Sequence, residues 1–304
     1  MMMNTQNFRD EQEKMTILQE TYHLENGVQI PKLGLGTWFI DDDKAAKAVR
    51  DAVKAGYRLI DTAQAYGNER GVGEGVRTCG LPREELFVTS KVAAEAKTYE
   101  EAARSIDETL AKMGLEYLDL MIIHSPQPWT EFRVENRYFA ENKEVWRALE
   151  DAYAAGKLRA IGVSNFLQDD LENLLDDCRI KPMVNQILLH ITNTDKALLD
   201  YCHAHGILVE AYSPIAHGEA LKNPAITQMA KKYGVTPAQL CIRYVLQLGT
   251  VALPKTANPA HMQDNSAVDF QISTEDMRTL EAMEKIESYG EFDMFPVFSG
   301  KPLS

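Results

Sequence analysis

The sequence predicts an α/β fold: a single (β/α)8 TIM barrel with an N-terminal β-hairpin and extra helices. Strand and helix signals alternate along the whole chain, and eight short apolar runs have the length of strands. No Pro/Gly/Ser-rich linker divides the 304 residues. Eight strand–helix units close into a barrel rather than an open sheet, and a barrel of this length routinely forms one domain.

The strands and the hairpin have local signals of their own. Residues 1–18 are polar and aperiodic, with Met15 as a second candidate start, so we expect a disordered extension and then one barrel domain over 19–304. Asn26-Gly27 lies between two short runs at 22–31 and predicts a two-residue β-hairpin that plugs one end of the barrel. The barrel strands are predicted at 34–38, 58–62, 86–91, 118–124, 158–164, 183–187, 207–213 and 251–255.

Helical stretches lie between the strands, for example at 41–56, 98–114 and 142–156, and several end in glycine. Two segments exceed the basic repeat. Residues 127–142 predict a long loop over the barrel mouth, and 217–235 predict an extra helix of the kind that binds phosphate in barrels. The glycines of GVGEGV (71–76) lack the GxGxxG spacing of a dinucleotide site, so we interpret them as the end of a helix.

Composition narrows the range of partners. A net charge of −13 disfavours nucleic acid and anionic membranes, so a phosphate-bearing ligand needs a local basic site. The four cysteines are scattered, which fits a reducing cytoplasm. The N-terminus has no apolar signal core and no run approaches the ~18 residues of a membrane span. We expect a cytoplasmic monomer or weak homodimer acting on a small molecule.

Four chemically active side chains follow apolar runs at the predicted strand ends. Asp61 and Lys91 end two of these runs, His124 ends a third, and Tyr66 lies just after the first. The strand ends of a barrel are where its active sites are built. A carboxylate, an ammonium, an imidazole and a phenol there suggest a proton donor, Tyr66, whose pKa Lys91 would lower while Asp61 orients the lysine.

Each residue also has a purely structural interpretation. A tyrosine in a polar loop is usually a surface or packing residue, and a strand-end histidine is usually a satisfied core residue. The Asp61–Lys91 pair alone could be a salt bridge that closes the barrel, since a buried lysine needs a partner. The functional interpretation depends on the four occurring together. No metal site is predicted, because His203 and His205 are two apart in a helical stretch and point to different faces.

Eight short motifs follow one another along the chain: GLGTW (34–38), LIDTAQAYGNE (59–69), FVTSK (87–91), DLMIIH (119–124), AIGVSNF (160–166), VNQI (184–187), AYSP (211–214) and LPKT (253–256). They resemble the motifs of the aldo-keto reductase superfamily, in the group of bacterial 2,5-diketogluconate reductases. The resemblance extends from residue 22 to about 286, with the motifs in the correct order.

The resemblance implies an enzyme that reduces aldehydes or ketones reversibly with NADPH, without a Rossmann fold. Asp61, Tyr66, Lys91 and His124 would be the catalytic residues, with Tyr66 as the general acid. The implied cofactor contacts follow the chain from the nicotinamide to the adenine end: Gly36, Thr37, Ser164, Asn165, Gln186, Tyr212, Ser213, Ile215, Gly218, Lys255, Thr256, His261, Asp264 and Asn265. Tyr212 would stack on the nicotinamide, and Lys255 and Thr256 would meet the 2′-phosphate.

One position departs from the family pattern. His261 stands six residues after Lys255, where the family usually has an arginine that reaches the 2′-phosphate. Histidine is largely neutral at pH 7, so NADPH preference is less secure and NADH use becomes an option. The substrate would contact Tyr66, His124, Trp38 and Trp129, although both tryptophans could instead be packing residues. The aromatic tail at 289–298 could add to the same pocket.

Two other function classes compete with a reductase. A cofactor-sensing binding subunit, like the potassium-channel β subunits, would keep the same four residues, but the near-minimal chain and the lack of a docking signal disfavour it. A metal-dependent hydrolase or isomerase on a barrel would need a cluster of metal ligands, and the sequence shows none. Cofactor titration followed by turnover on small aldehydes separates the three.

Overall fold

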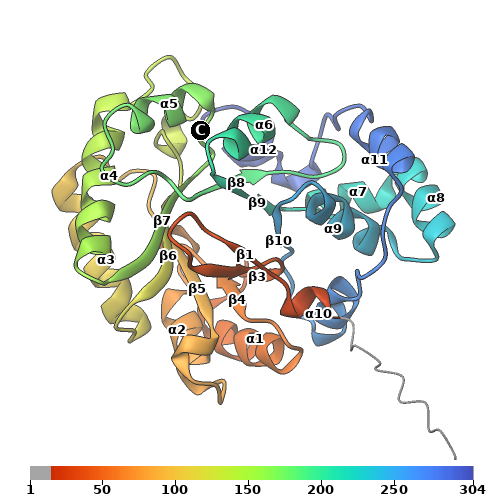
Figure 1. Ribbon diagram of the computed structural model, residues 1–304, viewed down its shortest axis with the longest axis horizontal. Coiled ribbons are helices and arrows are strands. Elements are labelled where there is room, and N and C mark those ends of the chain that lie inside the picture. The colour runs from red at the N-terminus through yellow and green to blue at the C-terminus, as the bar shows by residue number, and fades with distance from the viewer. Residues whose placement is uncertain (1–14, 304) are drawn as a thin grey trace, which may run out of the picture.

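Eight parallel strands, β3 to β10, close into a barrel in the structure, a computed structural model that describes residues 15–303 (Figure 1). Their spatial order follows the chain, and parallel bridges from Leu33 to Ala252 and from Gly36 to Lys255 join the last strand to the first. The strands are β3 Gly34–Gly36, β4 Leu59–Asp61, β5 Phe87–Val92, β6 Leu118–Ile123, β7 Leu158–Ser164, β8 Val184–Leu188, β9 Leu208–Tyr212 and β10 Val251–Leu253. All eight predicted strands are confirmed.

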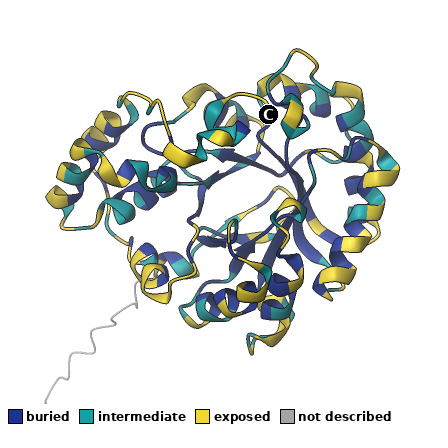
Figure 2. Cartoon of the chain, turned by 180° about the vertical axis from the view of Figure 1, so that it is seen from behind, coloured by how far each residue is buried: buried dark blue, intermediate teal, exposed yellow. Residues whose placement is uncertain are grey.

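Helices surround the barrel, with buried inner faces and exposed outer faces (Figure 2). They are α1 Asp42–Lys54, α2 Glu69–Thr78, α3 Tyr99–Met113, α4 Phe139–Ala154, α5 Gln168–Leu175, α6 Lys196–Ala204, α7 Glu219–Lys222, α8 Pro224–Tyr233, α9 Pro237–Gln247, α10 Pro259–Ser266, α11 Thr274–Glu281 and α12 Pro296–Ser299. Helices α7 and α8 are the predicted addition after β9. No helix in the described part of the chain is both long and apolar enough to cross a membrane.

Local sequence explains where helix α3 begins and ends. Thr98 and Glu101 form a reciprocal capping box, in which each side chain accepts a hydrogen bond from the other residue's backbone N–H. The helix ends at Gly114, whose φ of 67° is a left-handed conformation that glycine adopts without strain. Helix α9 begins in the same way, with Thr236 capped against Gln239 and Pro237 in the first turn. These local signals fix the first residues of both helices and the last residue of α3.

The predicted hairpin closes the end of the barrel where the strands begin. Strands β1 (Thr21–His23) and β2 (Gln29–Pro31) pair antiparallel. Their loop is not the predicted two-residue turn: Gly27 N–H donates to the Leu24 carbonyl at 2.8 Å, and Gly27 has a φ of 83°. This geometry is typical of a three-residue loop with a left-handed glycine. Leu24 and Ile30 are buried against residues inside the barrel, such as Leu59 and Val251.

The folded part of the chain begins before residue 19. Residues 1–14, most of the expected extension, lie outside the described part of the chain. The short 3-10 helix η1 (Ile17–Gln19) belongs to the folded part, because Ile17 is only 1% exposed and packs in the main core. Its backbone N–H donates to Asp269 Oδ1 at 2.9 Å. An isolated isoleucine in a polar stretch gives too weak a periodic signal for sequence analysis to place it in the core.

We expected the glycines at 71–76 to lie at the end of a helix. They lie instead inside α2. A β-carbon on Gly73 would overlap the Met113 carbonyl oxygen, and one on Gly71 would overlap the Asp42 carbonyl oxygen. At Gly75 the nearest atom would be Val49 Cβ at 2.6 Å. The glycines therefore allow α2 to approach both α1 and α3 more closely than any other residue would permit.

Two segments cover the mouth of the barrel at the strand ends. The predicted mouth loop follows β6. It contains the short 3-10 helix η4 (Trp129–Glu131) and ends where α4 begins at Phe139. Gln127 organises this loop: its amide donates to the Val134 and Asn136 carbonyls and accepts from the Arg133 N–H. The C-terminal segment, with η6 (Gly290–Met294) and α12, lies beside the loop, and Leu303 N–H donates to the Trp129 carbonyl at 2.8 Å.

Candidate active site

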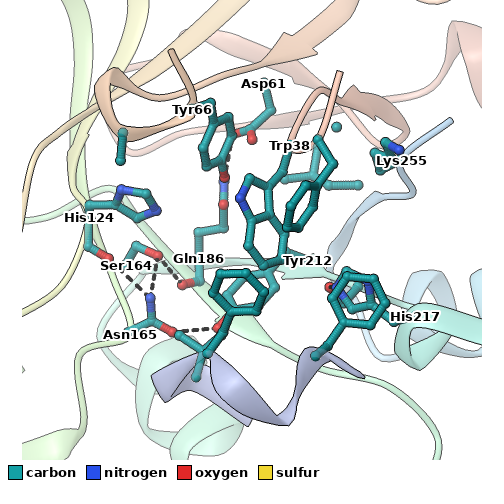
Figure 3. Close-up of a pocket in the computed structure, with 18 of the residues that line it drawn as sticks. Trp38, Asp61, Tyr66, His124, Ser164, Asn165, Gln186, Tyr212, His217 and Lys255 are labelled. Carbon is teal, nitrogen blue, oxygen red and sulfur yellow. Dashed lines mark hydrogen bonds between the residues drawn. The ribbon is translucent and has the colours of Figure 1, made fainter. Parts of the chain in front are cut away.

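A cavity of about 720 Å³ opens at the strand ends, below the mouth loop and the C-terminal segment. Strands β3, β4, β7, β8, β9 and β10 or the loops after them contribute to its lining, and so do the loop after β6 and residues 291–303. The predicted site residues that line it are Gly36, Thr37, Trp38, Asp61, Tyr66, His124, Trp129, Ser164, Asn165, Gln186, Tyr212, Ser213, Ile215, Gly218 and Lys255. Figure 3 shows ten of its lining residues by label, among them Asp61, Tyr66 and His124.

Asp61, Lys91 and Tyr66 form one hydrogen-bonded chain. Lys91 is fully buried on β5, and its ammonium donates to Asp61 Oδ2 at 2.6 Å and to the Thr62 carbonyl at 2.8 Å. Its third contact is the Tyr66 phenol oxygen, at 3.2 Å. The strand period of two turns both Lys91 and Asp61 toward the barrel interior, and the 3-10 helix η2 (Gln64–Tyr66) brings Tyr66 above them. The expected convergence of these side chains is therefore present.

Burial raises the pKa of the Tyr66 phenol above its ordinary value of 10.0, and the Lys91 ammonium opposes that rise. The Lys91 ammonium lowers the Tyr66 pKa in the predicted direction, but burial outweighs it and the net shift is upward. For Lys91 itself burial favours the neutral amine, but Asp61 and Tyr66 outweigh it and the pKa is raised. At neutral pH the lysine is charged and the phenol carries its proton.

His124 lies next to Tyr66, directly after β6, with the two ring centroids 5.7 Å apart. Burial, followed by the nearby Lys91 ammonium, lowers the pKa of His124 well below 6.5. The imidazole is therefore neutral at physiological pH. Its Nδ1 has no hydrogen-bond partner among the described residues, and its ring meets the edge of Trp129 at 5.1 Å. A neutral imidazole with a low pKa can donate a hydrogen bond that orients a carbonyl oxygen, and it is too weak a base to take the proton of the neighbouring phenol.

A second polar network crosses the floor of the cavity (Figure 3). The Asn165 amide donates to Ser164 Oγ at 3.1 Å and to the His124 carbonyl at 3.0 Å, and it accepts from the Tyr212 hydroxyl at 2.7 Å. Asn165 has a φ of 60°, a conformation that non-glycine residues rarely adopt and that clusters at functional sites. Gln186 joins this network to the catalytic chain, because its Nε2 donates to Asp61 Oδ1 at 2.8 Å.

The loop after β9 has an unusual backbone. Ser213, Ala216, His217 and Gly218 all have positive φ, so the chain turns sharply at the cavity edge. His217, which sequence analysis did not single out, lines the cavity, and its Nε2 lies 3.1 Å from Ser213 Oγ. Its ring packs on Phe292 at 3.9 Å between centroids. The signal that could have found it is its place between the expected ligands Ile215 and Gly218.

Lys255 is the cation of the cavity. It is an exposed residue after β10, and among residues 15–303 no carboxylate forms a salt bridge with it. Partial desolvation at the cavity edge lowers its pKa, with Asp41 opposing. The other residues expected at the adenine end, Thr256, His261, Asp264 and Asn265, do not line the cavity. Thr256 Oγ1 accepts from the Asn258 N–H, and His261 is an exposed residue of α10. Their cofactor roles stay predictions.

Aromatic side chains form the walls where a substrate would enter. Trp38 packs on Phe295 at 5.0 Å and lies 6.3 Å from Tyr66, and Trp129 faces His124. Phe292, Phe295 and Met294 come from the C-terminal segment, so the expected contribution of this tail is confirmed. No group of three or more potential metal ligands occurs in the described residues.

Comparison with known proteins agrees with this geometry. The model of the Aldo/keto reductase family matches residues 32–285. A glyoxal reductase of Bacillus subtilis is 44% identical over 90% of this chain and 96% of its own. An aldo/keto reductase of Brucella melitensis superposes with a TM-score of 0.80 at 36% identity, over 86% of this chain and 98% of that one. An aldo-keto reductase of Bombyx mori in complex with NADP has a TM-score of 0.80 at 30% identity, over 93% and 98%.

These matches span nearly the whole barrel and include every element that contributes a catalytic side chain. They show an oxidoreductase that reduces aldehydes or ketones to alcohols with a nicotinamide cofactor, and the chain belongs to the aldo/keto reductase family.

Proposed function

We propose that the protein reduces small aldehydes or ketones with NADPH, and that Tyr66 supplies the proton. The observation that carries this proposal is the hydrogen-bonded chain from Asp61 through the Lys91 ammonium to the Tyr66 oxygen, inside the cavity and beside a neutral imidazole. A salt bridge needed only for stability would not also hold a phenol at the cavity wall.

The protonation state of each residue determines its role in the reaction. Tyr66 holds its proton at neutral pH and donates it from Oη to the carbonyl oxygen as negative charge develops there. After Tyr66 has donated its proton, the Lys91 ammonium stabilises the negative charge on the Tyr66 phenolate oxygen. Asp61 keeps the ammonium oriented. His124 orients the carbonyl through its neutral ring. In the reverse direction the phenolate form of Tyr66 accepts the proton of the alcohol.

The donor set fits a nicotinamide dinucleotide. Ser164, Asn165 and Gln186 offer hydroxyl and amide groups that complement a carboxamide, and the Tyr212 ring lines the same wall. Lys255, without an acidic partner among the described residues, supplies positive charge for a phosphate in a chain of net charge −13. The bound cofactor supplies the hydride. Ser213, Ile215 and Gly218 would lie along its pyrophosphate, and Gly36 and Thr37 would contact it from the end of β3, where Gly36 bridges to Lys255.

The choice between NADPH and NADH depends on His261 and Lys255. Replacing His261 with arginine adds a permanent charge and a bidentate donor near the expected 2′-phosphate. His261→Arg should therefore bind NADPH more tightly, by about tenfold, and leave NADH affinity unchanged. Fluorescence titration of both cofactors measures this, with His23→Arg on the hairpin as the matched control. Equal gains for both cofactors, or none, would place His261 away from the phosphate.

The aromatic walls indicate a carbonyl compound with an apolar or planar group. A relative is a glyoxal reductase, whose substrate is small, so a panel should range from glyoxal to aromatic aldehydes. We also infer a cytoplasmic protein that is a monomer or weak homodimer.

Turnover with NADPH on this panel of carbonyl compounds tests the proposed reaction. Tight cofactor binding with no turnover on any carbonyl would instead favour a cofactor-sensing subunit.

A further inference from the structure

Glu210 is a buried carboxyl group that the proposed reaction does not use. It is the third residue of β9, it is completely buried, and it shares the barrel-facing side of the strand with Leu208 and Tyr212. Its Oε2 accepts a hydrogen bond from Gln186 Nε2 at 2.9 Å. Its Oε1 has no partner among the described residues. An ionised carboxylate with one orphaned oxygen in a dry interior is costly.

Gln186 links Glu210 to the catalytic chain. Its Nε2 has two hydrogens, and one goes to Glu210 Oε2 while the other goes to Asp61 Oδ1 at 2.8 Å. Two carboxyl groups therefore share one amide donor, and only Asp61 has an ammonium, Lys91, on its other oxygen. Two negative charges on this bridge would repel each other, so one proton is retained on the pair. Glu210, which has no cation, is the group that keeps it.

We propose that Glu210 is a positioning residue for the proton donor, holding a titratable proton inside the barrel and acting on Tyr66 through Gln186, Asp61 and Lys91. The proposal rests on the assignment of Tyr66 as proton donor. Burial, and after it the nearby Asp61, raise the pKa of Glu210 to about 8, against the opposing effects of Gln186 and Lys91. The proton is therefore present at pH 7 and leaves at alkaline pH.

The groups around Glu210 determine whether its ionisation raises or lowers the pKa of Tyr66. The titratable groups that face the interior near Glu210 are Tyr212 on β9 itself, Asp61 from β4, Tyr66 from η2, Lys91 from β5 and His124 after β6. The neighbouring strands present Gln186, Val251 and Leu253, which do not titrate. When Glu210 ionises, it adds a negative charge that disfavours phenolate at Tyr66. Carbonyl reduction should persist to higher pH, and alcohol oxidation, which needs the phenolate, should be restrained.

Glu210→Gln tests this, because the amide keeps the acceptor for Gln186 but never ionises. In the variant the Tyr66 phenol should titrate at lower pH than in wild type, by roughly half a pH unit or more. NMR of the protein labelled with 13C at the tyrosine ring carbon that bears the oxygen measures this, with Tyr66→Phe identifying the resonance. The alkaline limb of carbonyl reduction should shift by the same amount and in the same direction.

The matched control is Glu150→Gln, a buried carboxylate on α4 that is bonded to Arg179, away from the cavity. It should leave the Tyr66 titration unchanged. An identical Tyr66 titration in wild type and Glu210→Gln would overturn the proposal, even if carbonyl reduction is confirmed. A wild type with no turnover would refute the proposed function, while the phenol titration would still decide the role of Glu210.

The wild type alone offers a second test, which holds even if the variant does not fold. Infrared spectra should show the carbonyl stretch of a protonated carboxylic acid at pH 6.5, which disappears as the pH rises through about 8. Wild-type protein labelled with 13C at its glutamate side-chain carboxyls should show one resonance that titrates near the same pH. The absence of a protonated carboxyl at pH 6.5 would mean that Glu210 is ionised, and the proposal would be wrong.

Discussion

Lys91 shows how the chemistry of single residues builds the site. A fully buried ammonium is expensive, and it is stable here because Asp61, the Thr62 carbonyl and the Tyr66 oxygen occupy all three of its hydrogens. The same contacts orient Tyr66 toward the cavity. The order of the pKa effects matters, because burial keeps the phenol protonated until a substrate oxygen gains negative charge.

The first prediction concerns Tyr66. Tyr66→Phe removes the proton donor but leaves the ring and the cofactor residues in place, so NADPH should still bind. Carbonyl reduction should fall about 100- to 10,000-fold, the usual worth of general acid catalysis. Steady-state kinetics with an aldehyde measure this, and Tyr117→Phe, at the other end of the barrel, is the control. A near wild-type rate for Tyr66→Phe would refute the assignment.

At the scale of elements, the glycines of α2 determine how closely the helices pack around β4 and β5. Each of them lies where a β-carbon would meet backbone or β-branched atoms that cannot move cheaply. Overpacking of this kind usually costs 1–3 kcal/mol in the free energy of unfolding. Because α2 follows directly from the η2 turn that carries Tyr66, its packing also affects the position of the proton donor.

The second prediction follows from this close packing. Gly73→Ala should lower the free energy of unfolding by about 1–3 kcal/mol, although alanine favours helix more than glycine does. Urea unfolding followed by circular dichroism measures the change. Glu74→Ala, one residue further along α2 and partly exposed, should change stability by no more than about 0.5 kcal/mol. Increased stability in Gly73→Ala would show that α3 can move aside.

The mouth loop is anchored by another buried lysine. The Lys97 ammonium donates to the Ser125 and Pro126 carbonyls and to Asn142 Oδ1, at 3.3, 3.1 and 3.0 Å. These acceptors begin the loop directly after His124 and tie it to α4. Among residues 15–303 no carboxylate is bonded to this ammonium, and burial lowers the pKa of Lys97 to about 8, with Glu95, Glu141 and Asp170 opposing.

This lowered pKa predicts the direction of a pH effect on stability. Between pH 8 and 10.5 the unfolded chain holds the Lys97 proton more firmly than the folded chain. The free energy of unfolding should therefore rise with pH in that range, by at most about 1.4 kcal/mol per pH unit from this group. Lys97→Met should lack this rise, whereas Lys54→Met, an exposed lysine on α1, should keep it. Urea unfolding at pH 7.5 and 9.5 compares them, and parallel pH profiles for wild type and Lys97→Met would contradict the pKa.

At the scale of the whole molecule, the two ends of the chain have opposite roles. The N-terminal hairpin closes the barrel where the strands begin, and the C-terminal segment covers the cavity where they end. Tyr289 anchors that segment, because its hydroxyl lies 2.8 Å from Nε2 of the buried His190. The residues beyond it, as far as 303, contribute Phe292 and Phe295 to the cavity but make no hydrogen bond to the side chains of Asp61, Lys91 or Tyr66.

Removal of residues 291–304 should therefore separate binding from chemistry. The KM for an aromatic aldehyde should rise about tenfold, because aromatic walls are lost, while kcat changes little. Glyoxal, which is too small to reach those walls, should show a much smaller change in KM and serves as the internal control. Phe295→Ala should give part of the same effect. A loss of kcat for both substrates would mean that the segment also positions the catalytic residues.

The strands, the helices and the convergence of Asp61, Tyr66, Lys91 and His124 followed from the sequence alone. Each depends on local periodicity or on the rule that the ends of parallel strands meet at one edge, and both can be read without coordinates. The aromatic composition of residues 289–298 also suggested that this tail adds to the pocket.

Only the tertiary structure decided the interactions between segments far apart in the chain. Glu210 lies 149 residues after Asp61 in the numbering, and only barrel closure brings both to one Gln186 amide. His217 gains its contact with Phe292 in the same way, and Ile17 its place in the core. The net direction of the Tyr66 pKa also needed the structure, because burial is a property of the whole packed barrel and not of neighbouring charges alone.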